Sequence, residues 1–358
     1  MRIRDVYLLN GQTLNDSDTV TVDLTKGLKI LSLRIQYQDQ NGATSNTVCR
    51  LNGMVSKIAV VDGSNVLYSG SMRELQADNC FRRKRMPFQI LSEDDDIVVQ
   101  EECFIDFWRT LGDVAWYLDT SLYANPQLQL THALTVSGTA GFVTAKGKLT
   151  VIAKVIDSGA PARAGFVMLK ELDSFASTAS GDHTTDLPLD FPIAALIVQA
   201  PVDANSPDTY LSNVKLTADT DSYIPLNESM LDLMKQNAGE GGPFDQEIDA
   251  LPDTSATLLG DFYYRTRASI ISAGATAKAL ATVVTANQIT MAFTTGETGV
   301  IGAKLEGYCP HGSVIYRFGD GIDPAQAFSP QGVGKFQLKL TGASTGATVK
   351  VVTLQQHP

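Results

Sequence analysis

One five-residue string in the chain matches the nucleophile motif of a large class of hydrolases. Gly342-Ala343-Ser344-Thr345-Gly346 has the G-x-S-x-G spacing, which places a reactive serine on a tight turn between a strand and a helix. That motif also needs an acid and then a histidine downstream. Residues 348–354 instead read as another strand, and His357 is the one histidine that follows. The context predicts a hairpin turn and no catalytic serine.

The histidines and cysteines do not form a recognisable metal-binding pattern. All of them are dispersed singly and no CxxC pair occurs (His132, His183, His311, His357; Cys49, Cys80, Cys103, Cys309). Cys309-Pro310-His311 joins two potential ligands but lacks a third, which is more typical of a loop. Dinucleotide-binding, P-loop and H-E-x-x-H strings are absent. We therefore predict no metal, no cofactor and no enzyme activity, with free and mostly buried thiols.

Two runs of like charge are the strongest remaining chemical features. The first is basic and the second acidic, and only a short segment separates them (Arg82, Arg83, Lys84, Arg85; Glu93, Asp94, Asp95, Asp96). Such runs usually lie on solvated loops. In a protein that assembles from identical copies, the basic run of one copy could contact the acidic run of another. We take the basic run as a candidate inter-subunit contact and the acidic run as a candidate ion site.

Composition limits the protein class. The 358 residues are 44% hydrophobic and 19% charged, which is typical of a folded globular protein. The net charge of −11 argues against sequence-specific binding or coating of nucleic acid. Residues 1–10 lack the apolar core of a signal peptide, and the most apolar window, 191–202, is too short to span a bilayer. We expect synthesis in a cytoplasm, and the length favours two domains.

The chain contains an internal repeat with a period of about 160 residues. Asp23-Leu24 recurs as Asp186-Leu187, 163 positions later, and five further matches keep that offset: Thr21/Thr184, Ile30/Ile193, Leu33/Leu196, Ile35/Val198 and Gln36/Gln199. A second block matches at an offset of 158: Ser71-Met72/Ser229-Met230, Glu74/Asp232 and Leu75/Leu233. Residues 128–131 resemble residues 336–339 at an offset of 208. The second copy therefore holds about 50 additional residues, which we place within about 238–310.

Each copy reads as a series of short strands with one helix. Residues 31–37 alternate apolar and polar side chains, the pattern of a half-buried strand, and similar runs recur throughout both halves. Helical spacing occurs at 71–79 and 227–236, where Met72, Leu75, Met230 and Leu233 would face the core. We predict an all-β protein made of two tandem eight-stranded antiparallel jelly rolls, each with a short helix. The predicted division is an N-terminal arm (1–17), a first jelly roll (18–157), a linker (158–165) and a second jelly roll (166–358).

The segment 170–200 resembles a known family. Phe175, Ser180-Gly181, Asp186-Leu187-Pro188 and the run 195–200 are similar to the start of the second jelly roll in double jelly-roll major capsid proteins of tailless icosahedral viruses, the lineage of tectiviruses and corticoviruses. The resemblance implies a homotrimer that tiles as a pseudo-hexamer and packs against neighbouring trimers and penton or minor capsid proteins in the virion. An internal membrane is a further candidate partner, although residues 1–17 are short for a membrane-contacting arm.

Two other classes of function stay open at this stage. A virion spike or another carbohydrate- or receptor-binding β-sandwich protein would share the strand-rich composition. A hydrolase, such as a glycosidase that uses paired carboxylates, would need two acids to face each other across a cleft, and a sequence does not show this. Saturable sugar binding by a small oligomer would favour a binder, whereas trimers that polymerise would favour a capsid protein.

Overall fold

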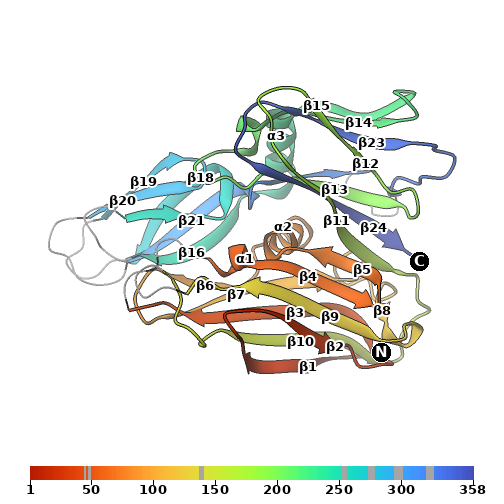
Figure 1. Cartoon of the computed structure of the whole chain (residues 1–358), viewed down its shortest axis with the longest axis horizontal. Helices are drawn as coiled ribbons and strands as arrows, with labels where there is room; N and C mark the ends of the chain where they lie inside the picture. Colours follow the sequence, from red (N-terminus) through yellow and green to blue (C-terminus); the bar gives the residue numbers. More distant parts are fainter. Residues whose placement is uncertain are drawn as a thin grey trace.

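The computed structural model describes residues 1–43, 46, 50–136, 141–250, 256–272, 279–293, 301–319 and 326–358. Cys49 lies outside these residues. Strands dominate the described chain, as the alternating pattern predicted, and they form two stacked units with an extension on one side (Figure 1). None of the described helices is long and apolar enough to cross a membrane.

The first unit is a sandwich of two antiparallel sheets. Its strands and helices, in chain order, are β1 (Arg2–Thr13), β2 (Ser17–Asp23), β3 (Lys29–Gln40), α1 (Leu51–Met54), β4 (Val55–Asp62), β5 (Asn65–Gly70), α2 (Met72–Arg83), β6 (Gln89–Ser92), β7 (Val98–Asp106), β8 (Leu118–Asp119), η1 (Thr120–Leu122), β9 (Pro126–Ala133) and β10 (Lys148–Ser158). One sheet has the order β1-β10-β3-β7-β6, with β8 also on β3, and the other has the order β2-β9-β4-β5. Alternate side chains of both sheets fill a shared apolar core.

The second unit repeats this arrangement. Its elements are β11 (Phe166–Ala176), β12 (Asp182–Asp186), β13 (Ile193–Gln199), η2 (Pro207–Thr209), β14 (Leu211–Ala218), β15 (Tyr223–Ser229), α3 (Met230–Gly241), β22 (Ser313–Arg317), β23 (Phe336–Gly342) and β24 (Thr348–His357). The sheet orders are β11-β24-β13-β22 and β12-β23-β14-β15. These strands follow one another in space as their counterparts do in the first unit, so the repeat in the sequence is a repeat of the fold.

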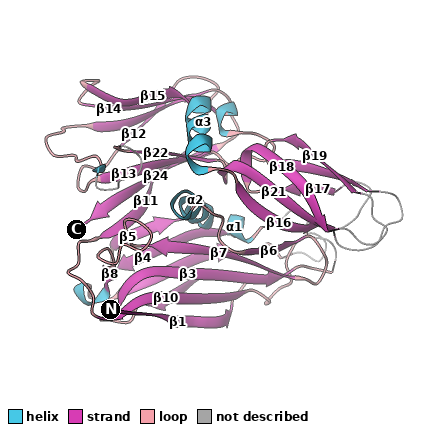
Figure 2. Ribbon diagram, turned by 180° about the vertical axis from the view of Figure 1, so that it is seen from behind, coloured by secondary structure: helices cyan, strands magenta, loops and turns pink. Residues whose placement is uncertain are grey.

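Additional strands lie between α3 and β22, in the segment where the sequence places its insertion. They are β16 (Phe244–Ala250), β17 (Ala256–Leu259), β18 (Phe262–Ser272), β19 (Ala279–Thr285), β20 (Gln288–Phe293) and β21 (Ile301–Pro310). Strands β16, β21 and β18 extend the first unit's sheet, and β17, β20 and β19 form a separate small sheet. The insertion therefore projects beside both units (Figure 2).

Two parallel strand pairs join the units into continuous sheets. Strand β5 lies beside β11, with Ser69 opposite Lys170. Strand β6 lies beside β16, with Leu91 opposite Ile248. Because backbone hydrogen bonds cross both junctions, the two units share sheets and do not hang on a flexible tether. Residues 159–165 connect β10 to β11 outside this shared framework.

Both predicted helices are present, and each begins directly after a serine that caps it. Ser71 is the N-cap of α2 and forms a capping box with Glu74, in which each side chain accepts the other residue's backbone N–H. Ser229 caps α3 through the N–H of Asp232. Residues 227–229, predicted as helical, still belong to β15. Met72, Leu75, Met230 and Leu233 are buried, as predicted.

Two details of the sequence reading need correction. Residues 2–13, predicted as part of an N-terminal arm that precedes the first jelly roll, form β1 along β10, because Val6, Leu8 and Leu9 pack against the first core. The third repeat block is offset by 210 rather than 208. Leu24 donates its N–H to the Pro126 carbonyl, and Leu187 donates likewise to Phe336. A two-residue slip leaves the same strand face toward the core, so hydrophobic pattern alone does not detect it.

We expect truncation of either helix leucine to weaken the fold. Leu75 and Leu233 are 0% and 1% exposed, and deleting most of a buried leucine side chain costs about 2 to 5 kcal/mol. Urea denaturation of Leu75→Ala and Leu233→Ala measures this loss. Leu231→Ala on the outer face of α3, where the residue is 36% exposed, should cost less than about 0.5 kcal/mol. Equal losses at all three positions would contradict the helix orientation.

Candidate functional site

The structure places Ser344 in a connection between two strands. β23 ends at Gly342 and β24 begins at Thr348, so the helix that a nucleophile elbow requires is replaced by a strand. The Ser344 hydroxyl donates to the neighbouring Thr345 carbonyl at 3.4 Å. The strand predicted after the motif is present, but the predicted hairpin is wrong, because β23 and β24 belong to different sheets and the segment crosses between them.

The four histidines lie in separate surroundings. Each has its own neighbour: the Asn15 carbonyl for His132, Asp173 for His183, Asp261 for His311 and the Phe166 ring for His357. Burial lowers the pKa of His311 to about 4 despite the nearby Asp261 carboxylate, which keeps its imidazole neutral at physiological pH. Within the described ranges, no three His, Cys, Asp or Glu side chains gather in a way that could hold a metal ion. Cys80, Cys103 and Cys309 are free and buried, as predicted for these three.

The basic run divides into an inner and an outer half. The Arg83 guanidinium donates to both carboxylate oxygens of Asp106, at 2.7 and 2.6 Å, and lies 3.7 Å from the centre of the Phe104 ring. Arg82 donates to Asp78 and to the Asp106 carbonyl. Lys84 and Arg85 are exposed. The expectation that the whole run lies on a solvated loop is therefore wrong for Arg82 and Arg83. The last turn of α2 lies against β7, and the buried carboxylates of Asp78 in α2 and Asp106 in β7 bind these two arginines.

The acidic run is divided in the same way, and the structure does not gather its side chains with others into a group of three that could hold a metal ion among the described residues. Glu93 is completely buried, and neither of its carboxylate oxygens has a hydrogen-bond partner. Its backbone N–H donates to the Asp249 carbonyl of β16, so it lies at the second junction between the units. Asp94 is partly exposed, and Asp95 and Asp96 face solvent. The run was predicted as one exposed feature, but its first residue continues a buried strand end.

Helix α2 lies between the two units in both views (Figures 1 and 2). Nine of its twelve residues are buried, including Glu74, Gln76, Asp78 and Asn79. Lys350 of β24 donates to Glu74 at 2.6 Å and to Glu171 of β11 at 2.9 Å. Burial raises the pKa of Glu74, and Lys350 opposes this shift. This ion pair links the helix of the first unit to a sheet of the second.

A buried polar cluster lies on the insertion side of α2. Asn52 and Gln76 donate to the Glu101 carboxylate at 2.8 and 3.3 Å, and Asn52 also reaches Asp261 of the insertion at 3.4 Å. Gln89 lies within hydrogen-bond distance of both carboxylates. Burial, and then the Asp261 charge, raise the pKa of Glu101. Sequence reasoning missed this cluster because its members are up to 209 positions apart and carry no motif.

A repeated asparagine was also missed, although the sequence contained its signal. Asn79 exchanges two hydrogen bonds with the backbone of Phe104, at 2.9 and 2.7 Å. Asn237 does the same with Ile315, at 2.8 and 2.7 Å. The two asparagines are identical residues at the offset of 158 that already related the helices. In each unit this side chain fixes the helix to the same strand of the sandwich, β7 in the first unit and β22 in the second.

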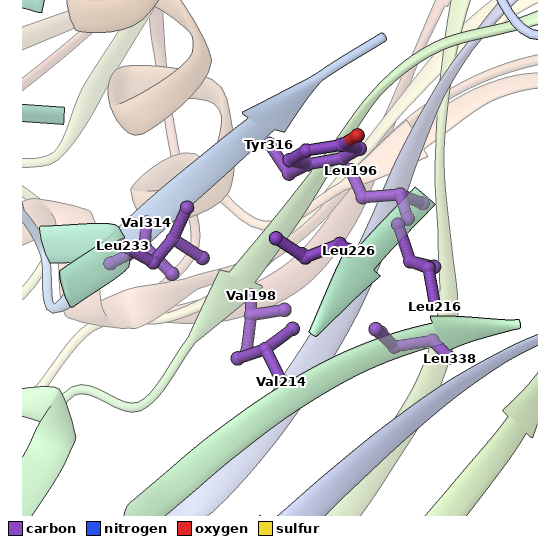
Figure 3. Close-up of a pocket in the computed structure, with 9 residues that line it drawn as sticks. All are labelled: Leu196, Val198, Val214, Leu216, Leu226, Leu233, Val314, Tyr316 and Leu338. Atoms are coloured by element: carbon purple, nitrogen blue, oxygen red, sulfur yellow. The ribbon is translucent and has the colours of Figure 1, made fainter. Parts of the chain in front are cut away.

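One small cavity lies inside the second unit (Figure 3). Apolar side chains and one tyrosine line it: Leu196, Val198, Val214, Leu216, Leu226, Leu233, Val314, Tyr316 and Leu338. The Tyr316 hydroxyl is already bonded to the Pro225 carbonyl at 3.1 Å. The lining offers no acid, base or nucleophile, so we interpret the cavity as a packing gap in the core between two sheets.

Comparisons identify the architecture. No protein-family model and no curated protein matches the chain. The major capsid protein of Sulfolobus turreted icosahedral virus matches with a TM-score of 0.62 and 9% identity, covering 100% of this chain and 97% of that one. The major capsid protein of bacteriophage PM2 matches with a TM-score of 0.54 and 11% identity over 99% and 97% of the two chains. VP54 of PBCV-1 matches with a TM-score of 0.58 and 9% identity, covering 99% of this chain and 93% of that one.

The chain has the double jelly-roll fold. This agrees with the resemblance drawn from residues 170–200, and it extends over nearly the whole length of each compared protein. At identities of 9 to 11%, the match concerns architecture and carries no side-chain role from those proteins to this one. What distinguishes this double jelly roll must therefore be read from its own contacts.

Removing the Arg83 charge should destabilise the protein. The Arg83 and Asp106 side chains are 10% and 1% exposed, and breaking a buried ion pair by removing one partner typically costs about 3 to 5 kcal/mol. We expect Arg83→Gln to lower the thermal midpoint clearly. The matched double variant Lys84→Gln/Arg85→Gln should leave it within about one degree, since exposed charges contribute little. A loss of stability in the second variant alone would contradict this division of the run.

Glu93 should make stability depend on pH. Burial raises the pKa of Glu93 from 4.5 to about 7, against the opposing charge of Arg50. Between these values the folded protein keeps a proton that the unfolded chain loses, so stability falls as pH rises and the penalty is complete above pH 7. Glu93→Gln should therefore be more stable than the parent by about 3 kcal/mol at pH 8 and equal to it near pH 4. Urea titrations at both pH values test this, with Asp95→Asn as the exposed control. A pH-independent difference would refute it.

Proposed function

We propose that the chain is the major capsid protein of an icosahedral virus and acts as a structural, non-catalytic shell subunit. The observation that carries the proposal is the tandem double jelly roll. Its matches to the capsid proteins of bacteriophage PM2 and of Sulfolobus turreted icosahedral virus cover at least 97% of both chains compared. In this proposal three copies form a trimer with six jelly rolls, a pseudo-hexameric tile. Two similar units in one chain let a threefold object occupy a nearly sixfold position in a lattice.

The described surface supports assembly better than catalysis or small-ligand binding. The serine motif is a strand connection, the histidines are dispersed, and the cavity in the second unit is apolar. The proposed partners are neighbouring trimers in the virion, penton or minor capsid proteins, and an internal membrane. Lys84 and Arg85, the exposed half of the basic run, stay candidates for contact between subunits. We propose residues 18–157 and 166–358 as the two structural domains, with β1 added to the first.

The soluble unit should be a trimer that assembles further. Sedimentation of the purified protein at micromolar concentration should give the mass of three chains, and electron microscopy should show hexagonal tiles or closed shells. A monomer at every concentration would contradict the proposal. Saturable binding on a glycan array without further assembly would favour the alternative of a spike or another carbohydrate- or receptor-binding protein.

A further inference from the structure

Strands β5 and β11, which join the jelly rolls within one chain, have repeat counterparts that each lie at the edge of a sheet among the described strands. At the junction, β5 of the first unit lies beside β11 of the second. The counterpart of β5 is β15, because each follows β4 or β14 and precedes the helix; the counterpart of β11 is β1, the first strand of its unit. Both β15 and β1 are edge strands of their sheets. Exposed edges present free backbone donors and acceptors that favour pairing with another chain.

The equivalence can be followed to single residues. Ser69 and Asn227 each lie two positions before the serine that caps the next helix. Lys170 and Val6 each lie opposite a residue of the last strand, Thr353 and Ala153. Those two residues in turn lie opposite Leu196 and Leu33, the repeat pair at an offset of 163. Since Ser69 and Lys170 pair at the internal junction, their counterparts are Asn227 and Val6.

The helices show the same difference between a covered and an uncovered side. Both are held to their own unit by the repeated asparagine, Asn79 or Asn237. The far side of α2 is covered by the second jelly roll, where Lys350 reaches Glu74. On α3 only Met230, Leu233 and Met234 are buried, and Asp232, the counterpart of Glu74, is exposed. The side of α3 that corresponds to the internal junction thus faces solvent.

Both edge strands and α3 also carry exposed apolar side chains. Ile3 and Tyr7 of β1 are 42% and 60% exposed, while Tyr223 and Ile224 of β15 are 55% and 42% exposed. Leu231 adds a further apolar group at the start of α3. Both edges therefore combine free backbone groups with exposed apolar side chains, a surface suited to association with another chain.

We propose that β15 and the outer face of α3 in one copy dock against the β1 edge of a second copy, in the same manner in which β5 and α2 meet β11 within the chain. Asn227 of one copy then lies beside Val6 of the next. The contact is head-to-tail, so repeating it produces a ring if the rotation closes and a filament if it does not. This surface deepens the proposed capsid function and rests on it, because three such contacts would close the trimer.

Disulfide trapping tests the register of the contact. The double variant Val6→Cys/Asn227→Cys should form covalent dimers and trimers on mild oxidation, which appear on a non-reducing gel. Each single variant alone should give no cross-linked product, and a mixture of the two should stop at dimers. The parent measures any background from the native cysteines, three of which are buried. The matched pair Thr19→Cys/Thr184→Cys, on β2 and β12, should remain uncross-linked.

A second variant tests the surface without new bonds. Asn227→Arg/Glu228→Arg should abolish the trimer in sedimentation while the circular-dichroism spectrum stays that of the folded parent, because both side chains are exposed. Thr184→Arg is the control and should assemble normally. If the arginine variant remains a trimer like the parent, and the Val6→Cys/Asn227→Cys variant does not cross-link, this interface alone is overturned. Self-cross-linking of one single variant overturns the head-to-tail arrangement, and a monomeric parent overturns the capsid proposal with it.

Discussion

The structure depends on burying α2, a helix rich in polar residues, between two sheets of different jelly rolls. Such a helix is stabilised in that position by partners for its buried polar side chains, since a side chain without any partner costs free energy comparable to a lost hydrogen bond. Glu74 has Lys350 from the second unit, Gln76 has Glu101, and Asn79 has the β7 backbone. These contacts come from both sides, so neither jelly roll completes the environment of the helix alone.

The same requirement explains why the two copies have diverged. Helix α3 retains the serine cap and the asparagine of α2, which act within one unit. It lacks a buried carboxylate, and the side that would correspond to the covered side of α2 is exposed, with Leu231 and Asp232 open to solvent. The repeat is therefore conserved where contacts lie inside a unit and changed where they lie between units. This difference gives the molecule two distinct ends, a precondition for directional assembly.

Backbone pairing makes the relation between the units rigid. Both parallel junctions place strands of one unit beside strands of the other. The buried charged side chains described above lie beside these junctions or beside α2: Glu93, the Glu101 cluster and the Arg83–Asp106 ion pair. Carboxylates at these positions are buried with few charges to balance them, which raises the pKa of Glu93 and of Glu101. The junction thus combines strong geometric constraint with electrostatic cost.

The sequence alone determined the features that depend on local periodicity. Alternation identified β3, helical spacing located both helices to within a few residues, and matched spacing revealed the repeat. These signals need only neighbouring residues or a second copy of the same pattern. The alignment of β9 with its repeat counterpart β23 was not determined, since a shift by two residues leaves the same side chains facing the core. Burial of Arg83 and Glu93 was not visible either, because a run of charge looks the same in solvent and against a buried partner. Glu101 and Asp261 meet only after two junctions bring distant strands together, so the polar cluster that they share was decided by the tertiary structure.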